Sequence, residues 1–150
     1  MNKQSHKTMQ AVSFEEVLDQ ILKRDVRYHR DAYVFIREAL DFTQKTAGKE
    51  GKGQKQHVTP QELLNGIRDF ALASYGPMAI TLFEEWGIRS CQDFGELVFI
   101  MVEHSLLAKT DRDSRADFEG GYDFQETFRN PFLPKNKHSR KLLPAKTTRA

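Results

Sequence analysis

The stretch GPMAITLFEEWGIRSCQDFGELVFIMVEHSLL, residues 76–107, indicates how this chain folds. Pro77 and the apolar residues that follow it predict a short helix, which Gly87 ends. Ser90 predicts the start of a second helix, and this helix is apolar on nearly every side, with Phe94, Leu97, Val98, Met101, Val102, Phe99 and Ile100. A helix of that kind is typical of the centre of a domain. The stretch therefore predicts a helical fold with its second helix inside.

Apolar residues spaced at i, i+3, i+4 and i+7 predict further helices on both sides of this stretch. Thr59 and Glu62 have the spacing of a capping box, and Pro60 occupies the first helical position. Asp123 is the expected cap of a short last helix. The predicted helices cover about residues 13–25, 30–44, 60–75 and 124–129.

Residues 106–110 and 115–118 predict the two strands of a small β-hairpin. Helix, turn, helix and hairpin follow one another in this order in winged helix-turn-helix proteins. However, the predicted second helix carries acids and no Lys or Arg, whereas a helix that reads DNA bases needs basic and amide side chains. The sequence therefore predicts a mainly α fold of five to six helices with one short β-hairpin, and leaves a winged-helix-like arrangement open.

The length of 150 residues and the distribution of apolar residues predict one helical domain over residues 13–134. Residues 45–56 contain three glycines, four lysines and no large apolar residue, so we expect a mobile loop there. Residues 1–12 are expected to be a disordered N-terminus, and residues 135–150 a disordered basic tail.

The net charge of +2 conceals an acidic body and a basic end. Residues 13–128 carry 14 basic and 21 acidic residues, whereas residues 129–150 carry seven basic residues and no acid. Such an asymmetry indicates an anionic partner for the tail, although a solubilising extension gives the same composition. No aromatic residue is interleaved to stack on bases, so contact with phosphates alone is expected. The candidate nucleic-acid contacts are Lys135, Lys137, Arg140, Lys141, Lys146 and Arg149.

Several kinds of chemistry have no motif in this sequence. There is no P-loop, no dinucleotide-binding glycine motif and no nucleophile elbow. The five histidines lack zinc spacing, and Cys91 is expected to be a buried small residue rather than a nucleophile paired with His57 or His104. The longest uncharged run, residues 70–83, is too short to span a membrane. We therefore predict no catalytic, cofactor-binding or metal-binding residue, no membrane partner and a cytoplasmic location.

Five segments of this chain carry a resemblance: RYHRDAYVFIREALDF (27–42), QELLNGIRDFAL (61–72), YGPMA (75–79), WGIRSCQDFGELVF (86–99) and DSRADFEGGYDF (113–124). They resemble a family of small conserved hypothetical proteins of planctomycete and verrucomicrobial bacteria. The resemblance covers about residues 13–134 and implies a cytoplasmic bacterial protein, with no reaction, ligand or catalytic residue attached to it. Val26 departs from the proline expected there after Asp25.

Polar residues that cluster where loops meet are the candidate interaction surface, because loops on a rigid scaffold often carry binding sites. We expect a non-catalytic protein-interaction module that uses these corners or an exposed aromatic patch near Trp86. The alternatives are a nucleic-acid- or ribosome-associated factor that uses the tail and lysine loop, and an enzyme without a motif. The same polar residues would otherwise hold the loops in place. They are Arg27, Tyr28, His29, Arg30 and Asp31 at one corner and Asp113, Arg115, Asp117 and Tyr122 at the other.

Overall fold

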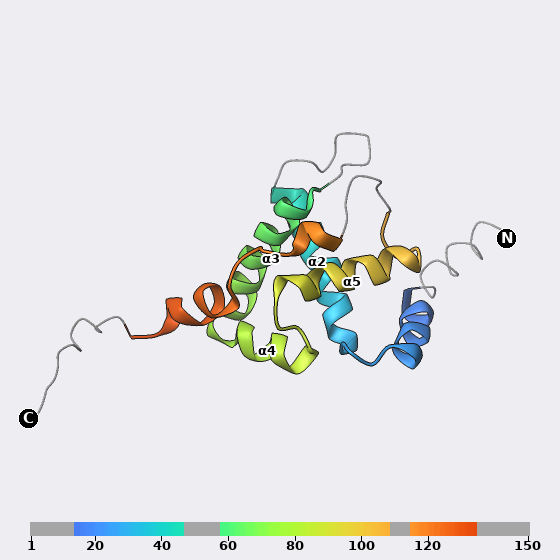
Figure 1. Cartoon of the computed structure of the whole chain (residues 1–150), viewed down its shortest axis with the longest axis horizontal. Helices are drawn as coiled ribbons and strands as arrows, with labels where there is room; N and C mark the ends of the chain where they lie inside the picture. Colours follow the sequence, from blue (N-terminus) through green and yellow to red (C-terminus); the bar gives the residue numbers. More distant parts are fainter. Residues whose placement is uncertain (1–13, 47–57, 109–114, 135–150) are drawn as a thin grey trace, which may run out of the picture.

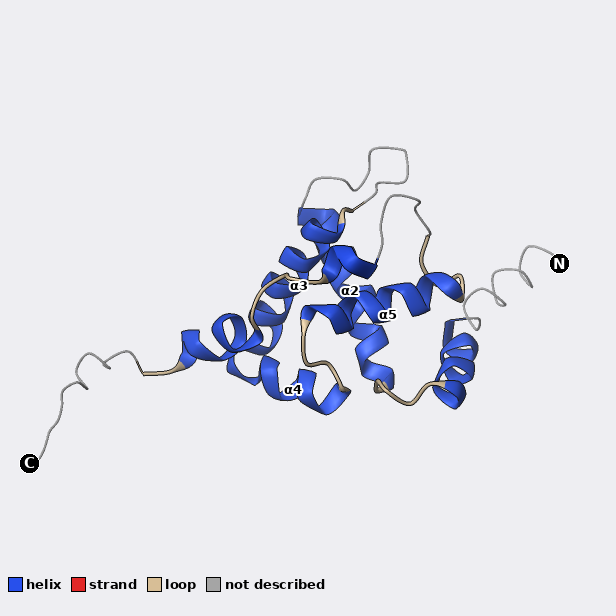
Figure 2. Cartoon of the chain, viewed as in Figure 1, coloured by secondary structure: helices blue, strands red, loops and turns tan. Residues whose placement is uncertain are grey.

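The computed structural model of the chain describes residues 14–46, 58–108 and 115–134. These residues form helices and helical turns, with no strand among them (Figures 1 and 2). In chain order, the elements are a first helix over residues 14–24, α2 (Arg30–Thr46), α3 (Pro60–Tyr75), η1 (Gly76–Met78), α4 (Ala79–Trp86), α5 (Cys91–Glu103), η2 (Arg115–Phe118), η3 (Gln125–Arg129) and η4 (Asn130–Phe132).

Two helices begin at the capping boxes that their sequences contain. The Thr59 hydroxyl accepts a 3.1 Å hydrogen bond from the N–H of Glu62, whose carboxylate accepts one of 3.0 Å from the N–H of Thr59. Ser90 and Asp93 form the corresponding pair at the start of α5. Because such pairs satisfy N–H groups that have no partner within the helix, they fix where the helix begins. The predicted bounds of the third helix, 60–75, are confirmed.

The core is built around α2, which packs against α3, α4 and α5. The Phe35 ring on α2 contacts the rings of Phe70, Phe83 and Trp86, with centroids 5.3 to 5.7 Å apart. On α5, one face is buried and the other, which includes Val98 and Phe99, is only partly buried. The predicted mainly helical fold is confirmed. The central position predicted for α5 needs a correction, since α2 is the helix that contacts α3, α4 and α5.

A close crossing joins α2 to α3. Gly66 on α3 faces Thr43 on α2, and a Cβ atom at Gly66 would lie 1.8 Å from the Thr43 hydroxyl oxygen. The Thr43 hydroxyl is buried and donates a 2.7 Å hydrogen bond to the carbonyl oxygen of Ala39. The absence of a side chain at Gly66 therefore sets the distance between these two helices.

The expected second strand of the hairpin is wrong, because residues 115–118 form the helical turn η2. Phe118 is 2% exposed and packs against Gly95 of α5. Arg115, at the other end of the turn, forms an ion pair with Glu96 of α5. Two anchors three residues apart suit a 3₁₀ turn, in which such side chains lie on the same side. Contacts with α5 thus determine this segment, not pairing with a strand.

Several expected features lie outside the described residues. These are the N-terminal segment 1–12, most of the lysine loop at 45–56, the hairpin turn at 111–114 and the tail at 135–150. None of the described helices combines the length and the apolar character that a membrane span requires.

Candidate functional site

The loop at residues 25–29, which carries Arg27, Tyr28 and His29 of the first predicted corner, lies on the turn between α4 and α5. The N–H of His29 donates a 3.0 Å hydrogen bond to the carbonyl oxygen of Trp86. Gly87 has a left-handed backbone with φ of 91°, and a Cβ atom there would lie 2.2 Å from the carbonyl oxygen of Arg27. Glycine adopts this backbone conformation without strain and has no Cβ atom to clash with that oxygen. Backbone contacts therefore hold this loop against the turn that leads into α5.

One carboxylate, that of Glu96 on α5, joins the two predicted corners. Arg27 approaches it from the first corner, with Nη1 at 3.5 Å from Oε1. Arg115 approaches it from η2, with Nε at 3.2 Å from Oε2. The arginine side chains are 53% and 50% exposed, and the Glu96 side chain is 26% exposed. Arg27 and Arg115, which were predicted in separate clusters, thus meet at Glu96, and we call these three residues the arginine bridge.

Both arginines have further partners inside the molecule. Arg27 binds Asp25 with Nε and Nη2, at 3.0 and 2.8 Å from its two carboxylate oxygens. This contact lowers the pKa of Asp25 below its ordinary value, since hydrogen bonds from the guanidinium favour the charged carboxylate. The Arg115 guanidinium lies 5.6 Å from the centre of the Phe99 ring. The arginine bridge is therefore largely satisfied without a partner protein.

Tyr28 lies beneath the arginine bridge and is only 3% exposed. Its hydroxyl donates a 2.5 Å hydrogen bond to Asp93, and Asp93 also accepts hydrogen bonds from the N–H groups of Arg89 and Ser90. Burial, and then the bond to Asp93, raises the pKa of Tyr28 above its usual range. Tyr28 is thus a buried structural residue and not part of an accessible surface.

The other residues of the first corner divide between the surface and the first helix. Arg30 forms ion pairs with Glu15 and Asp19, which attach the first helix to the start of α2. His29 and Asp31 have side chains that are 57% and 58% exposed, and the N–H of Asp31 donates to the His29 ring at 3.0 Å. His29 and Asp31 are therefore the most accessible members of this corner.

Trp86 is 8% exposed and lies in the aromatic core. Its ring packs against those of Phe35, Tyr75 and Phe83. The expectation of an exposed aromatic patch formed by Trp86 is therefore wrong. The helical spacing of Phe83 and Trp86 places both rings on the buried face of α4.

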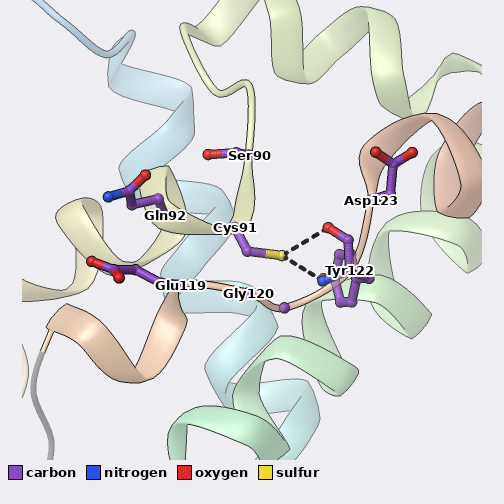
Figure 3. A pocket seen from close by; sticks show the side chains of 8 residues that line it. Ser90, Cys91, Gln92, Glu119, Gly120, Tyr122 and Asp123 are labelled. Carbon is purple, nitrogen blue, oxygen red and sulfur yellow. Dashed lines mark hydrogen bonds between the residues drawn. The ribbon is translucent and has the colours of Figure 1, made fainter.

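Tyr122 lies away from the arginine bridge, beside a hollow of about 400 Å³ at the start of α5 (Figure 3). Its hydroxyl donates a 2.7 Å hydrogen bond to the carbonyl oxygen of Leu64, so this side chain joins the 121–123 segment to α3. The Cys91 thiol lies against the Tyr122 backbone, with Sγ 3.4 Å from the nitrogen and 3.6 Å from the oxygen. The hollow is lined by Ser90, Cys91, Gln92, Glu119, Gly120, Gly121, Tyr122 and Asp123.

Cys91 has the features of a structural thiol. It is 3% exposed, and burial raises its pKa, which disfavours the thiolate. His104 does not serve it as a base, since its ring Nδ1 lies 2.9 Å from the carbonyl oxygen of Ile100 on its own helix. His57 lies outside the described residues. Among the residues that the structure describes, no group of three His, Cys, Asp or Glu side chains is arranged to hold a metal ion.

Sequence reasoning missed three exposed apolar side chains on elements that lie near one another. Met78 in η1 is 54% exposed, and Phe132 and Leu133, in and just after η4, are each 45% exposed. η3 packs against η1, α3 and α4, and η4 follows it directly, so these side chains belong to neighbouring elements (Figure 1). We call Met78, Phe132 and Leu133 the apolar end.

The segments that form the apolar end are acidic. Residues 76–87 and 123–134 contain four acids, Glu84, Glu85, Asp123 and Glu126, and one base, Arg129. All five of these side chains are exposed. The structure gives none of them an ion pair with another described residue. Their negative charge is therefore presented to solvent on the same segments that carry the exposed apolar side chains.

The remaining predicted residues contribute less. Asp117 is exposed on η2. Asp113 and the six candidate nucleic-acid contacts of the tail lie outside the described residues. Two residues that complete the corners, Asp93 and Glu96, did not enter the predicted surface. Their signal was present in the sequence, because acids on an apolar helix without Lys or Arg need cationic or hydroxyl partners from other elements.

Comparison with known proteins adds no relative, since no family model, curated protein or solved structure matches this chain.

Proposed function

We propose that this chain is a non-catalytic protein-interaction module that binds its partner through the apolar end. The observation that carries the proposal is the exposure of Met78, Phe132 and Leu133 on neighbouring elements. Single exposed apolar residues are ordinary, whereas apolar side chains that gather on one surface mark interaction sites. A partner that covers them removes apolar area from water, at about 25 cal/mol for each Å².

The state of the polar corners supports this choice of surface. Arg27 and Arg115 share Glu96, and Tyr28 is buried against Asp93. A partner could use these groups only after breaking their contacts within the chain. The exposed ion pairs that it formed in their place would add little binding free energy. We therefore assign the corner contacts to holding loops in place, and we choose the exposed apolar end as the surface for a partner.

Charge favours a protein partner over a nucleic acid at this surface. The described residues contain 10 basic and 18 acidic residues. The exposed carboxylates Glu84, Glu85 and Glu126 would repel phosphates, which proteins contact with Lys and Arg. The resemblance to the bacterial family supports placing the module in a bacterial cytoplasm, and we include that location in the proposal.

A nucleic-acid- or ribosome-associated factor is the second candidate, because the sequence concentrates its positive charge in two segments. Residues 135–150 carry six Lys or Arg and no acid, and residues 45–56 carry four lysines. Fluorescence anisotropy with duplex DNA and structured RNA over a salt series tests this candidate. Binding that weakens steeply with salt and with Lys135→Gln, Lys137→Gln, Arg140→Gln and Lys141→Gln together supports it. The absence of binding at low salt rejects it.

A capture comparison tests the first candidate. The full chain and a Met78→Ser, Leu133→Ser double variant are immobilised and exposed to bacterial extract, and the retained proteins are quantified. A loss of about 1.4 kcal/mol of binding free energy from these apolar contacts lowers the affinity tenfold. We therefore expect the double variant to retain less of the partner protein than the wild-type chain retains. Val26→Ser is the matched control, because Val26 is 85% exposed in the 25–29 loop.

The controls decide between the surfaces. Retention by wild type and Val26→Ser, with loss in the double variant, supports the apolar end. Equal retention by all three chains rejects it. Loss with Asp31→Ala, which changes the most accessible acid of the first corner, would instead place the site at the corner.

A further inference from the structure

We infer that the apolar end binds the C-terminal segment of the same chain, residues 135–150, with Leu142 and Leu143 against Met78, Phe132 and Leu133. The inference rests on the proposed function, since it concerns the same surface and makes access to that surface regulated. A partner protein then has to displace this segment.

Charge complementarity is the first argument for this occupant. Residues 135–150 contain six Lys or Arg and no acid. The segments that form the apolar end carry four acids and one base, and these charges are exposed without an ion pair among the described residues. Opposite charges on two surfaces of this kind favour and orient their association, and the attraction decreases as salt rises.

The pattern of the segment is the second argument. Leu142 and Leu143 are its only large apolar residues, and cations precede and follow them at Arg140, Lys141 and Lys146. The segment thus combines an apolar pair with cations, and the apolar end combines apolar side chains with acids on the same segments of the chain. A purely solubilising tail would not need the two leucines.

The length of the connection is the third argument, and it favours the chain's own tail over that of a second copy. Leu142 follows Leu133 by nine residues, and an extended chain of that length reaches about 30 Å. Leu133 itself belongs to the apolar end, so the tail starts on the surface that it would cover. A connection of this length provides an effective concentration of about 1 mM. A second copy at micromolar concentration competes poorly with it.

The occupied surface identifies the chemistry of the partner. A protein that displaces the segment must offer the same combination, apolar side chains flanked by Lys or Arg. A basic amphipathic helix or a basic peptide with paired leucines meets this requirement.

Paramagnetic relaxation in the full chain tests the inference. A nitroxide is attached to Cys in the Thr147→Cys variant, and the wild-type chain is the labelling control because Cys91 is buried. We expect broadening of the amide signals of residues 76–85 and 125–133, but not of those near Val26 and Arg115. The broadening should be lost with Leu142→Ser and Leu143→Ser, and it should decrease as salt is added.

Three results would overturn the inference. They are no broadening, broadening spread evenly over the domain, and broadening that persists in the double leucine variant. A mixture of ¹⁵N chain without nitroxide and unlabelled chain with nitroxide identifies contact between copies. Broadening in that mixture as strong as within one chain would assign the surface to a second copy and overturn the intramolecular assignment.

The failure of this inference differs from the failure of the proposed function. If the broadening is absent but capture still depends on Met78 and Leu133, the interaction module stands and its surface is unoccupied by the tail. If the broadening is present but capture does not depend on these residues, the tail contact stands and the apolar end is not the partner surface.

Discussion

Tyr28 donates a 2.5 Å hydrogen bond to Asp93, and the same carboxylate accepts the N–H groups of Arg89 and Ser90 at the start of α5. One side chain thus joins the 25–29 loop, the turn after α4 and the first turn of α5. Because Tyr28 is 3% exposed, this contact stabilises the fold and is not accessible to a partner. The first predicted corner is therefore mainly structural.

Tyr28→Phe tests this structural role. The change leaves Asp93 without the tyrosine hydroxyl, and we expect the free energy of unfolding to fall by about 1.5–3 kcal/mol, the range for hydrogen bonds to charged groups. Urea unfolding monitored by circular dichroism gives the value. The Tyr28→Phe, Asp93→Ala double variant should lose less stability than the sum of the losses in the two single variants, because the two residues share one interaction. Additive losses would contradict the shared contact.

Tyr33→Phe is the matched comparison, because Tyr33 is fully buried and its hydroxyl has no hydrogen-bond partner among the described residues. Removing a buried polar group without a partner recovers its desolvation cost, about 1–3 kcal/mol. We therefore expect Tyr33→Phe to be neutral or stabilising in the same urea experiment, in contrast to Tyr28→Phe. A clear loss of stability would show that the Tyr33 hydroxyl has a partner, such as a buried water.

The acid side of the pH profile reports on Asp25 and Arg27. Arg27 lowers the pKa of Asp25 below its ordinary value of 3.8, so the carboxylate stabilises the fold at higher pH. This contribution is complete above the unfolded-state pKa and is lost as the pH falls through the lower folded-state pKa. We expect NMR titration of the Asp25 carboxyl carbon to give a value under 3.8 in wild type and a higher one in Arg27→Gln. Equal values in the two chains would show that Arg27 does not hold Asp25.

The sequence predicted most of the helices, because local signals decide where helices begin. The Thr59 capping box forms as its spacing indicated, α5 begins after Ser90 as predicted, and α3 covers the predicted residues. The hairpin was wrong for a tertiary reason. Phe118 and Arg115 each find an anchor on α5, at Gly95 and Glu96, and neither contact can be read from the local pattern.

The candidate site was predicted less well than the fold. Loop composition identified both corners but not that Glu96 connects them, since that contact depends on how η2 packs against α5. Met78, Phe132 and Leu133 did not stand out, because apolar residues in helical segments are more often buried than exposed. Their exposure follows from the position of η1 and η4 at the edge of the fold.

Site-specific photo-cross-linking in living cells tests directly whether a partner protein contacts the apolar end. Benzoylphenylalanine replaces Phe132 in one chain and Val26 in another, both exposed positions on different parts of the molecule. We expect a covalent adduct larger than one chain at position 132, and none at position 26. An adduct at position 26 alone, or no adduct at either position, would contradict the assignment of the apolar end as the partner-binding surface.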